Sequence, residues 1–179
     1  MTSSRPDDRI AISEMIYTYA EAVDILGCHP ARPGEDDPAL PKAAALFQRC
    51  MTHDAMVRLY FEGSTAEPTH APAEGPETFA KWVRGYFTSY GYIGTYHLAG
   101  NIRPAFTGTD TADVSSLINS THWLADGRIL LAPIVYRDKA RRDTDGTWKF
   151  TARELVVQRW WISGGYFPVP TDPTLARPA

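Results

Sequence analysis

The chain has 179 residues, of which 44% are hydrophobic and 22% are charged. This composition is ordinary for a globular protein, and the length suits one domain with a sizeable core. Lys and Arg number 18 against 21 Asp and Glu, so the net charge is −3. Such a balance gives no reason to expect nucleic acid or an anionic membrane surface as a partner.

The two cysteines, Cys28 and Cys50, are too few and too isolated to predict a disulfide framework or a zinc site. The N-terminal stretch MTSSRPDD is polar and lacks the apolar core of a signal peptide. No apolar run approaches the roughly 20 residues of a membrane span. We therefore expect a cytoplasmic protein with reduced thiols.

A first helix is predicted from Asp8 to Asp24. Its apolar residues recur at spacings of three and four, which is one stripe of an amphipathic helix; they are Ile12, Ile16, Tyr19 and Val23. Asp24 lies at the far end of the helix beside this stripe. Its carboxylate is either a functional group at the rim of whatever the helix covers or a solvated residue of the helix end.

The middle of the chain alternates loops with short regular elements. Residues 27–41 are rich in Gly, Pro and Asp and predict a loop, and residues 42–51 predict a second helix. Residues 55–61 carry apolar side chains on both alternating faces, which predicts a strand covered on both sides. A turn-rich connection over 62–74 leads to a third helix over 75–89.

Four long extended segments follow, separated by Gly108-Thr-Asp, Asp126-Gly and Asp145-Gly turn signals. The segments are 92–106, 112–125, 128–141 and 148–163. Their spacing favours consecutive antiparallel pairing, and Pro133 indicates a bulge or an edge position in the third. Helices followed by long antiparallel strands predict an α+β fold, with a curved sheet around its helices and a cavity at one end.

We expect a single domain over 1–179, with terminal tails at 1–7 and about 166–179. The C-terminal tail holds too many prolines for a helix or a central strand. It is either disordered or lies across the body as a flap through Tyr166, Phe167 and Val169.

The common cofactor and nucleophile motifs are missing from the sequence. It contains no phosphate-binding glycine loop, GxGxxG, HExxH, nucleophile elbow or CxxC pair. We therefore expect neither a cofactor nor a metal. The chemistry that remains open to the chain is acid–base chemistry by Asp, His, Arg and Tyr side chains.

His97 lies in the middle of the first long strand. Period-two alternation places His97, Ala99 and Asn101 on one face, without saying which face points inward. A histidine there can be a hydrogen-bonded structural residue. If its face lines a pocket, its ordinary pKa of about 6.5 makes it the obvious proton carrier. An aspartate bonded to its second ring nitrogen would fix the tautomer and raise its basicity.

The other histidines are less informative. His122 lies in the next strand and is either close to the same volume as His97 or partly exposed beside Trp123. His29, His53 and His70 lie in loop or turn contexts and are expected at the surface.

Two arginines and several aromatic residues are further candidates. Arg153 follows the WKF triplet and is either a surface charge or a buried one, and burial would demand a partner such as a substrate oxygen. Arg137 is a weaker candidate for the same role. Aromatic residues, including Tyr17, Tyr60 and Trp82, belong to the core or to a pocket for an apolar ring compound.

Three features of the sequence carry a family resemblance: a first helix ending YAEAVD, the strand YHLAGNIRPAF, and the final hairpin VYRDKARRDTDGTWKF. With them the chain resembles the SnoaL-like branch of the nuclear transport factor 2-like superfamily, from Arg9 to about Trp161. The resemblance implies a cone-shaped α+β fold and a homo-oligomer, often a dimer or trimer. Functions vary widely on this fold, so it does not by itself predict an activity.

Hexachlorocyclohexane dehydrochlorinase is one enzyme group that the chain resembles. There an aspartate ending the first helix pairs with a strand histidine that abstracts a proton, and an arginine follows WKF. Asp24, His97 and Arg153 fall on these positions, and Asn101 fits that enzyme's strand. Its lysine, five residues before the aspartate, is Tyr19 here, which counts against dehydrohalogenation.

Two dehydratase groups resemble the chain as well. Bile-acid dehydratases have a tyrosine five residues before the aspartate, as this chain has Tyr19. Scytalone dehydratase is similar through Asp24 and His97, and its second pocket histidine falls at the spacing of His122.

The resemblances imply a cofactor-independent lyase of the dehydratase type, acting on a cyclic and largely apolar small molecule. His97 would take a proton from carbon, oriented by Asp24. Tyr19 would donate a hydrogen bond to the substrate oxygen or assist the departure of hydroxide. Arg153 and His122 would stabilise negative charge on oxygen.

Isomerisation or polyketide-type cyclisation with the same base is the enzymatic alternative, and a non-catalytic binding or scaffold protein is the other. The expected substrate contacts are Asn101, Arg137, Tyr17, Tyr60 and Trp82. The proposed chemistry also makes a geometric prediction: the Asp24 carboxylate should lie within about 3.2 Å of a His97 ring nitrogen.

Overall fold

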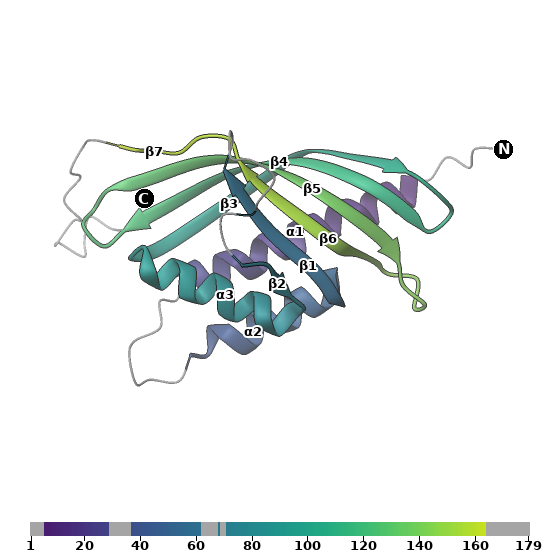
Figure 1. Ribbon diagram of the computed structural model, residues 1–179, viewed down its shortest axis with the longest axis horizontal. Helices are drawn as coiled ribbons and strands as arrows, with labels where there is room; N and C mark the ends of the chain where they lie inside the picture. The colour runs from purple at the N-terminus through teal and green to yellow at the C-terminus, as the bar shows by residue number, and fades with distance from the viewer. Residues whose placement is uncertain (1–5, 29–36, 62–67, 69–70, 164–179) are drawn as a thin grey trace, which may run out of the picture.

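The computed structural model describes residues 6–28, 37–61, 68 and 71–163. In this part of the chain, three helices lie on the concave side of one curved seven-stranded sheet (Figure 1). The helices are α1 (Pro6–Cys28), α2 (Ala39–Cys50) and α3 (Pro76–Ser89). The chain therefore has the α+β cone fold that the sequence predicts.

The sheet has the strand order β2-β1-β6-β5-β4-β3, and β7 pairs with β5 beside this path. The strands are β1 (Met51–Phe61), β2 (Ala73–Glu74), β3 (Tyr92–Phe106), β4 (Thr111–Leu124), β5 (Ile129–Arg142), β6 (Trp148–Val157) and β7 (Trp161–Ile162). Strands β3 to β6 pair consecutively and antiparallel, as predicted. Strand β1 pairs with β6 in parallel, which hairpin signals alone do not indicate.

All three helices are confirmed, and α1 and α2 are longer than predicted. Helix α1 continues past Asp24 to Cys28, and α2 begins at Ala39 and ends at Cys50. The loop predicted over 27–41 is therefore too long at both ends, and its residues 29–36 lie outside the described chain. Pro76 occupies the first turn of α3, where its missing N–H has no helical partner to lose.

The strand predictions needed three corrections. The last predicted strand, 148–163, is broken into β6 and β7, which pair with different stretches of β5. Strand β2 lies in a stretch predicted as connection, because two residues are too few to show a period. Strand β1 is buried at Val57 and Leu59 but only half-buried at Arg58 and Tyr60, so it is not covered equally on both sides.

Pro133 lies neither in an edge strand nor at a bulge. Strand β5 runs between β4 and β6, and its register shift against β6 falls between Lys139 and Ala140. The carbonyl of Pro133 accepts a hydrogen bond of 2.9 Å from the N–H of Gln158, in the gap between β6 and β7. The missing N–H of the proline faces this gap, so no ladder bond is lost.

A buried ion pair between β5 and β6 lies in the core. The Arg153 guanidinium donates hydrogen bonds of 2.7 Å to both Asp138 oxygens through Nε and Nη2, and neither side chain is exposed. Three rings enclose the guanidinium, with centroids at 3.9 Å, 4.5 Å and 4.2 Å for Tyr19, Tyr136 and Phe150. Burial by itself lowers the pKa of Arg153, but the Asp138 carboxylate raises it, and the net pKa is raised.

We expect Asp138→Asn to lower the free energy of unfolding by about 3–5 kcal/mol, because it leaves a buried cation without its counter-charge. Urea unfolding followed by tryptophan fluorescence measures this loss. The neutral double variant Asp138→Asn/Arg153→Met should be more stable than Asp138→Asn alone.

A matched control is Asp113→Asn, which removes the carboxylate of the exposed Asp113–Lys139 bridge, 2.9 Å long on the neighbouring strands. An exposed pair of this kind contributes less than about 1 kcal/mol. Equal losses at the two aspartates would contradict a structural role for the buried pair.

Candidate active site

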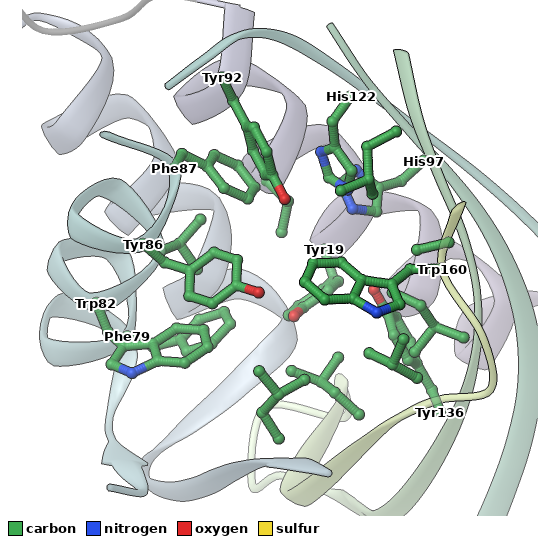
Figure 2. Close-up of a pocket in the computed structure, with 18 of the residues that line it drawn as sticks. Tyr19, Phe79, Trp82, Tyr86, Phe87, Tyr92, His97, His122, Tyr136 and Trp160 are labelled. Carbon is green, nitrogen blue, oxygen red and sulfur yellow. The ribbon is translucent and has the colours of Figure 1, made fainter. Parts of the chain in front are cut away.

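A cavity lies between α1, α3 and the inner face of the sheet (Figure 2). The empty space between its walls amounts to about 620 Å³, open solvent at its mouth included. Its lining is mainly aromatic and aliphatic, with the two imidazoles of His97 and His122 and four tyrosines as its polar members. A cavity of this kind suits an apolar ring compound.

Aromatic rings of α3 and α1 form a stacked wall of the cavity. The ring centroids of Phe79 and Trp82 are 5.8 Å apart with planes 17° from parallel, and those of Trp82 and Tyr86 are 5.4 Å apart at 22°. The Tyr19 ring stacks on the far side of Phe79 at 5.7 Å and 23°. Spacings of three and four place these α3 residues on one face of the helix, so the wall follows from the sequence period.

Asp24 and His97 meet at the cavity wall. Asp24 comes from near the C-terminal end of α1 and His97 from the middle of β3, and Oδ1 of Asp24 lies 2.6 Å from Nδ1 of His97. The same carboxylate accepts hydrogen bonds of 3.1 Å from the Thr95 hydroxyl and from the His97 backbone N–H. The distance is shorter than the predicted limit. Because Nδ1 donates to a carboxylate, the neutral imidazole keeps an unprotonated Nε2.

His122 lies beside His97 on β4 and lines the same cavity. Its ring stacks on Tyr92 at 4.4 Å and 19°, and its centroid is 5.5 Å from that of His97. Burial, together with the smaller effect of the neighbouring His97, lowers the pKa of His122 to about 3. His122 is therefore neutral near pH 7. Among the described residues, its Nδ1 has no hydrogen-bond partner.

Four tyrosines line the cavity: Tyr19, Tyr86, Tyr92 and Tyr136. Burial raises the pKa of each, to about 12 for Tyr92 and further for the others. At Tyr19 the charge of Arg153 opposes this rise without cancelling it. These hydroxyls therefore stay protonated and serve as hydrogen-bond donors rather than as bases.

The structure corrects the predicted position of Arg153. It lies beneath the rings of Tyr19 and Tyr136 and does not line the cavity. The partner that its burial demands is the Asp138 carboxylate rather than a substrate oxygen. Sequence reasoning missed Asp138 because it comes from the neighbouring strand of the hairpin, 15 residues away.

Asn101 does not line the cavity, although strict alternation would place it on the face of His97. A register shift between Gly100 and Arg103 marks a bulge, and Asn101 adopts a positive φ of 49° there. The extra residue reverses the alternation, so Asn101 is exposed.

Of the other predicted substrate contacts, Trp82 alone lines the cavity. Arg137 is exposed because its neighbours on β5 point inward, and Tyr60 lies on the face of β1 opposite to the cavity-lining Leu59. Tyr17 is 47% exposed on α1. His53 is exposed as expected but lies within β1 rather than a loop, and His29 and His70 lie outside the described residues.

The structure adds cavity residues that sequence reasoning did not propose. Tyr86 follows Trp82 by one helical turn, and Tyr136 shares the inward period of β5, so both had a sequence signal. Trp160 follows the end of β6 and lines the cavity from an irregular segment. No periodicity could have placed it there.

Comparison with known proteins gives the family. A family model described as a SnoaL-like domain matches residues 41–154. The chain belongs to the SnoaL-like domain family. His97, His122 and Arg153 lie inside the matched SnoaL-like region, whereas Asp24 and Tyr19 precede it on α1. A search of curated protein sequences finds no significant match.

Solved structures of similar fold cover nearly the whole SnoaL-like chain. A candidate scytalone dehydratase from Novosphingobium aromaticivorans is 22% identical, with a TM-score of 0.65, and covers 94% of this chain and 93% of its own. Hexachlorocyclohexane dehydrochlorinase LinA-type3 from Novosphingobium barchaimii is 20% identical, with a TM-score of 0.68 and coverages of 93% and 97%. A candidate aromatic ring hydroxylase from N. aromaticivorans is 22% identical, with a TM-score of 0.64 and coverages of 89% and 94%. At these identities the likeness shows the fold.

No three His, Cys, Asp or Glu side chains in the described part of the chain converge on a point where a metal ion could bind. None of the helices that the structure describes is both long and apolar enough to cross a membrane.

His122 predicts a loss of stability in acid. Its pKa of about 3 in the folded protein lies below the 6.5 of an unfolded histidine, so the unfolded chain binds the proton more readily below pH 6.5. This difference should cost about 2 kcal/mol of unfolding free energy at pH 5 relative to pH 8, and more as the pH falls toward 3. Urea unfolding of the wild type and of His122→Gln at the two pH values isolates this contribution.

The control is His53→Gln, since the side chain of His53 is 94% exposed. That variant should keep the wild-type pH dependence. If the unfolding free energy of His122→Gln also keeps the wild-type pH dependence, the pKa of His122 is not lowered in the folded protein.

Proposed function

We propose that the protein is a cofactor-independent lyase of the dehydratase type, acting on a neutral, cyclic, largely apolar substrate that carries a carbonyl and a hydroxyl group. The observation that carries the proposal is the 2.6 Å contact between Asp24 and His97 at the wall of an aromatic cavity. An imidazole oriented by a carboxylate beside a sheltered apolar volume is suited to act as a general base.

His97 is the proposed base. Its Nε2 takes a proton from the carbon next to the substrate carbonyl, and the electron pair left behind forms a carbon–carbon double bond as the carbon–oxygen bond to the hydroxyl breaks. The hydroxide takes up the proton held by the His97 imidazolium and leaves as water, which restores the neutral imidazole. Asp24 stabilises the imidazolium that forms in the first step, through the hydrogen bond at Nδ1.

Tyr19 is the proposed donor to the substrate oxygen. Its hydroxyl stays protonated because burial raises its pKa, and its ring lines the cavity. The Arg153 charge, 3.9 Å from the ring centroid, supports negative charge developing on an oxygen bound to that hydroxyl without touching the substrate. His122, being neutral, contributes a hydrogen bond rather than a positive charge.

The lining supports a neutral substrate. Among the described residues that line the cavity, none is Lys, Arg, Asp or Glu. A carboxylate, phosphate or ammonium group drawn into this volume would lose its hydration without gaining a counter-charge, which is unfavourable. A flat ring system with one or two oxygens suits both the stacked wall and the hydroxyl donors.

The names of two structural neighbours support an elimination. One is described as a candidate scytalone dehydratase and the other as a hexachlorocyclohexane dehydrochlorinase. Loss of water is favoured over loss of chloride here, because Tyr19 stands where the resemblance places the lysine of the dehydrochlorinase. Isomerisation or cyclisation would use the same base and donor but would conserve the mass of the substrate.

The test is turnover of a panel of cyclic β-hydroxyketones, followed by mass spectrometry for loss of one water. We expect His97→Gln to lower kcat by about 10²–10⁴-fold, because general-base catalysis contributes that much. Asp24→Asn should also lower kcat, since an amide cannot stabilise the imidazolium. The exposed His53→Gln is the matched control and should turn over at the wild-type rate.

Three outcomes would reject the dehydratase proposal. A product of unchanged mass would indicate isomerisation or cyclisation. Tight binding without turnover, with affinity unaffected in His97→Gln, would indicate a binding protein. Equal turnover by the wild type and His97→Gln would remove the proposed base.

We also propose that the protein is a homo-oligomer that associates through an outer apolar patch, defined as Tyr96 and Leu98 of β3 with Leu117 and Trp123 of β4. These residues are 41–55% exposed. Large apolar side chains that gather on a surface favour association, because association removes them from water. They lie on the outer face because Thr95 and His97, their neighbours in β3, point inward and are buried.

We expect Leu98→Asp/Leu117→Asp to dissociate the oligomer to monomers in sedimentation velocity, since it places charge within the outer apolar patch. The control Ile10→Asp changes an apolar residue that is 61% exposed on α1, outside the patch, and should leave the mass unchanged. A wild type that sediments as a monomer would exclude the oligomer.

A further inference from the structure

Helix α1 crosses strand β3 unusually closely at Gly27. This glycine is buried in the last turn of the helix, opposite Thr95. A Cβ added at Gly27 would lie 2.1 Å from Oγ1, 2.4 Å from Cγ2 and 2.7 Å from Cβ of Thr95. Carbon atoms do not approach a neighbour below about 3.0 Å, so the approach requires a residue without a side chain.

Rotation of the threonine would not relieve this contact. Cβ of Thr95 is fixed by the strand backbone and is itself only 2.7 Å from the added atom. With any larger residue at position 27, helix and strand would have to separate by about 1 Å or more before the contact with Oγ1 reached an ordinary 3.4 Å.

Glycine in this helix is otherwise unfavourable, because it loses more backbone freedom than alanine on folding. The glycines with positive φ angles are Gly75, Gly91, Gly127 and Gly146, and Gly27 is not among them, so a left-handed backbone conformation does not explain Gly27. The close approach to Thr95 does explain it.

The threonine opposite Gly27 is also the residue that orients the carboxylate. Thr95 donates a hydrogen bond of 3.1 Å to Asp24 Oδ1, and Asp24 precedes Gly27 by three residues, on the same face of α1. Two residues further along β3, His97 contributes its backbone N–H and its ring to the same carboxylate. The spacing at Gly27 therefore acts on every hydrogen bond of Asp24 to β3.

Two further contacts hold the helix end at this spacing. The Cys28 thiol donates to the carbonyl of Thr95 at 3.3 Å. From the other side, Arg84 of α3 donates to the carbonyl of Leu26 at 2.5 Å and is itself paired with Asp37. A shift of the last turn away from β3 would strain both contacts.

We propose that Gly27 is a positioning residue of the site: its contact with Thr95 sets the distance at which Asp24 reaches Nδ1 of His97. A separation of about 1 Å would stretch the 2.6 Å bond beyond hydrogen-bonding range. The geometric part of this proposal is independent of the reaction, and its effect on turnover rests on the proposed function.

The experiment compares four variants of the full-length protein: Gly27→Ala, Thr95→Gly, Gly27→Ala/Thr95→Gly and Gly85→Ala. The double variant moves a Cβ from the strand to the helix, because Thr95→Gly removes all three atoms that the added Cβ would meet. Gly85 is the matched control, a glycine of α3 with no atom within 4 Å of an added Cβ.

The readout is the ring N–H proton of His97 in NMR spectra of labelled protein, identified by its loss in His97→Gln. A short hydrogen bond to a carboxylate moves this resonance far downfield. We expect the downfield resonance in the wild type and Gly85→Ala, its loss in Gly27→Ala, and its return in the double variant to the position found in Thr95→Gly. Turnover should fall by on the order of 100-fold in Gly27→Ala, as for a misplacement of about 1 Å, and recover in the double variant.

A wild-type resonance in Gly27→Ala would overturn the proposal. So would a double variant that lacks the resonance while Thr95→Gly keeps it. If Gly27→Ala does not fold, the comparison of the double variant with Thr95→Gly still tests the proposal, which requires the resonance at the same position in both. Loss and recovery of the resonance with no change in turnover would support the positioning role and reject His97 as the base.

Discussion

The structure depends on the contact between the end of α1 and the middle of β3. One carboxylate, Asp24, accepts three hydrogen bonds from a helix-facing stretch of strand, through the Thr95 hydroxyl, the His97 backbone and the His97 ring. Together these bonds join a helix to a strand more than 70 residues away in the chain. The cavity lies beside this junction, so the contact that closes the fold also orients the imidazole.

The protein keeps its strongest buried charge out of its cavity. The charge of Arg153 is paired with Asp138 and enclosed by aromatic rings, and only the rings face the volume where a ligand would bind. An apolar ligand therefore meets a lining without exposed charge, while the field of the guanidinium still reaches the hydroxyl of Tyr19. The charged pair that stabilises the core is therefore separate from the cavity lining that would contact a ligand.

Local pattern predicted most of the fold, since the period of α1 and α3 and the turn signals between the long strands are local. It could not predict the parallel pairing of β1 with β6 or the bidentate partner of Arg153, because these depend on contacts between distant segments. The bulge at Asn101 reversed the inward–outward alternation of side chains along β3. A prediction from sequence alone could only continue that alternation unchanged. The pairing of Asp24 with His97 was expected from family resemblance, because periodicity placed neither side chain inward.

The two ends of the cavity differ in how firmly they are built. At the Asp24 end the wall is a helix bonded to the middle of the long strand β3. At the other end, Trp160 leads into β7, which pairs with β5 at only Leu130 and Leu131 and whose two residues are about half exposed. Local opening of so short a strand costs far less free energy than unfolding. Fraying of β7 would therefore displace the Trp160 part of the cavity wall at a lower cost in free energy than any motion that separates Asp24 from His97.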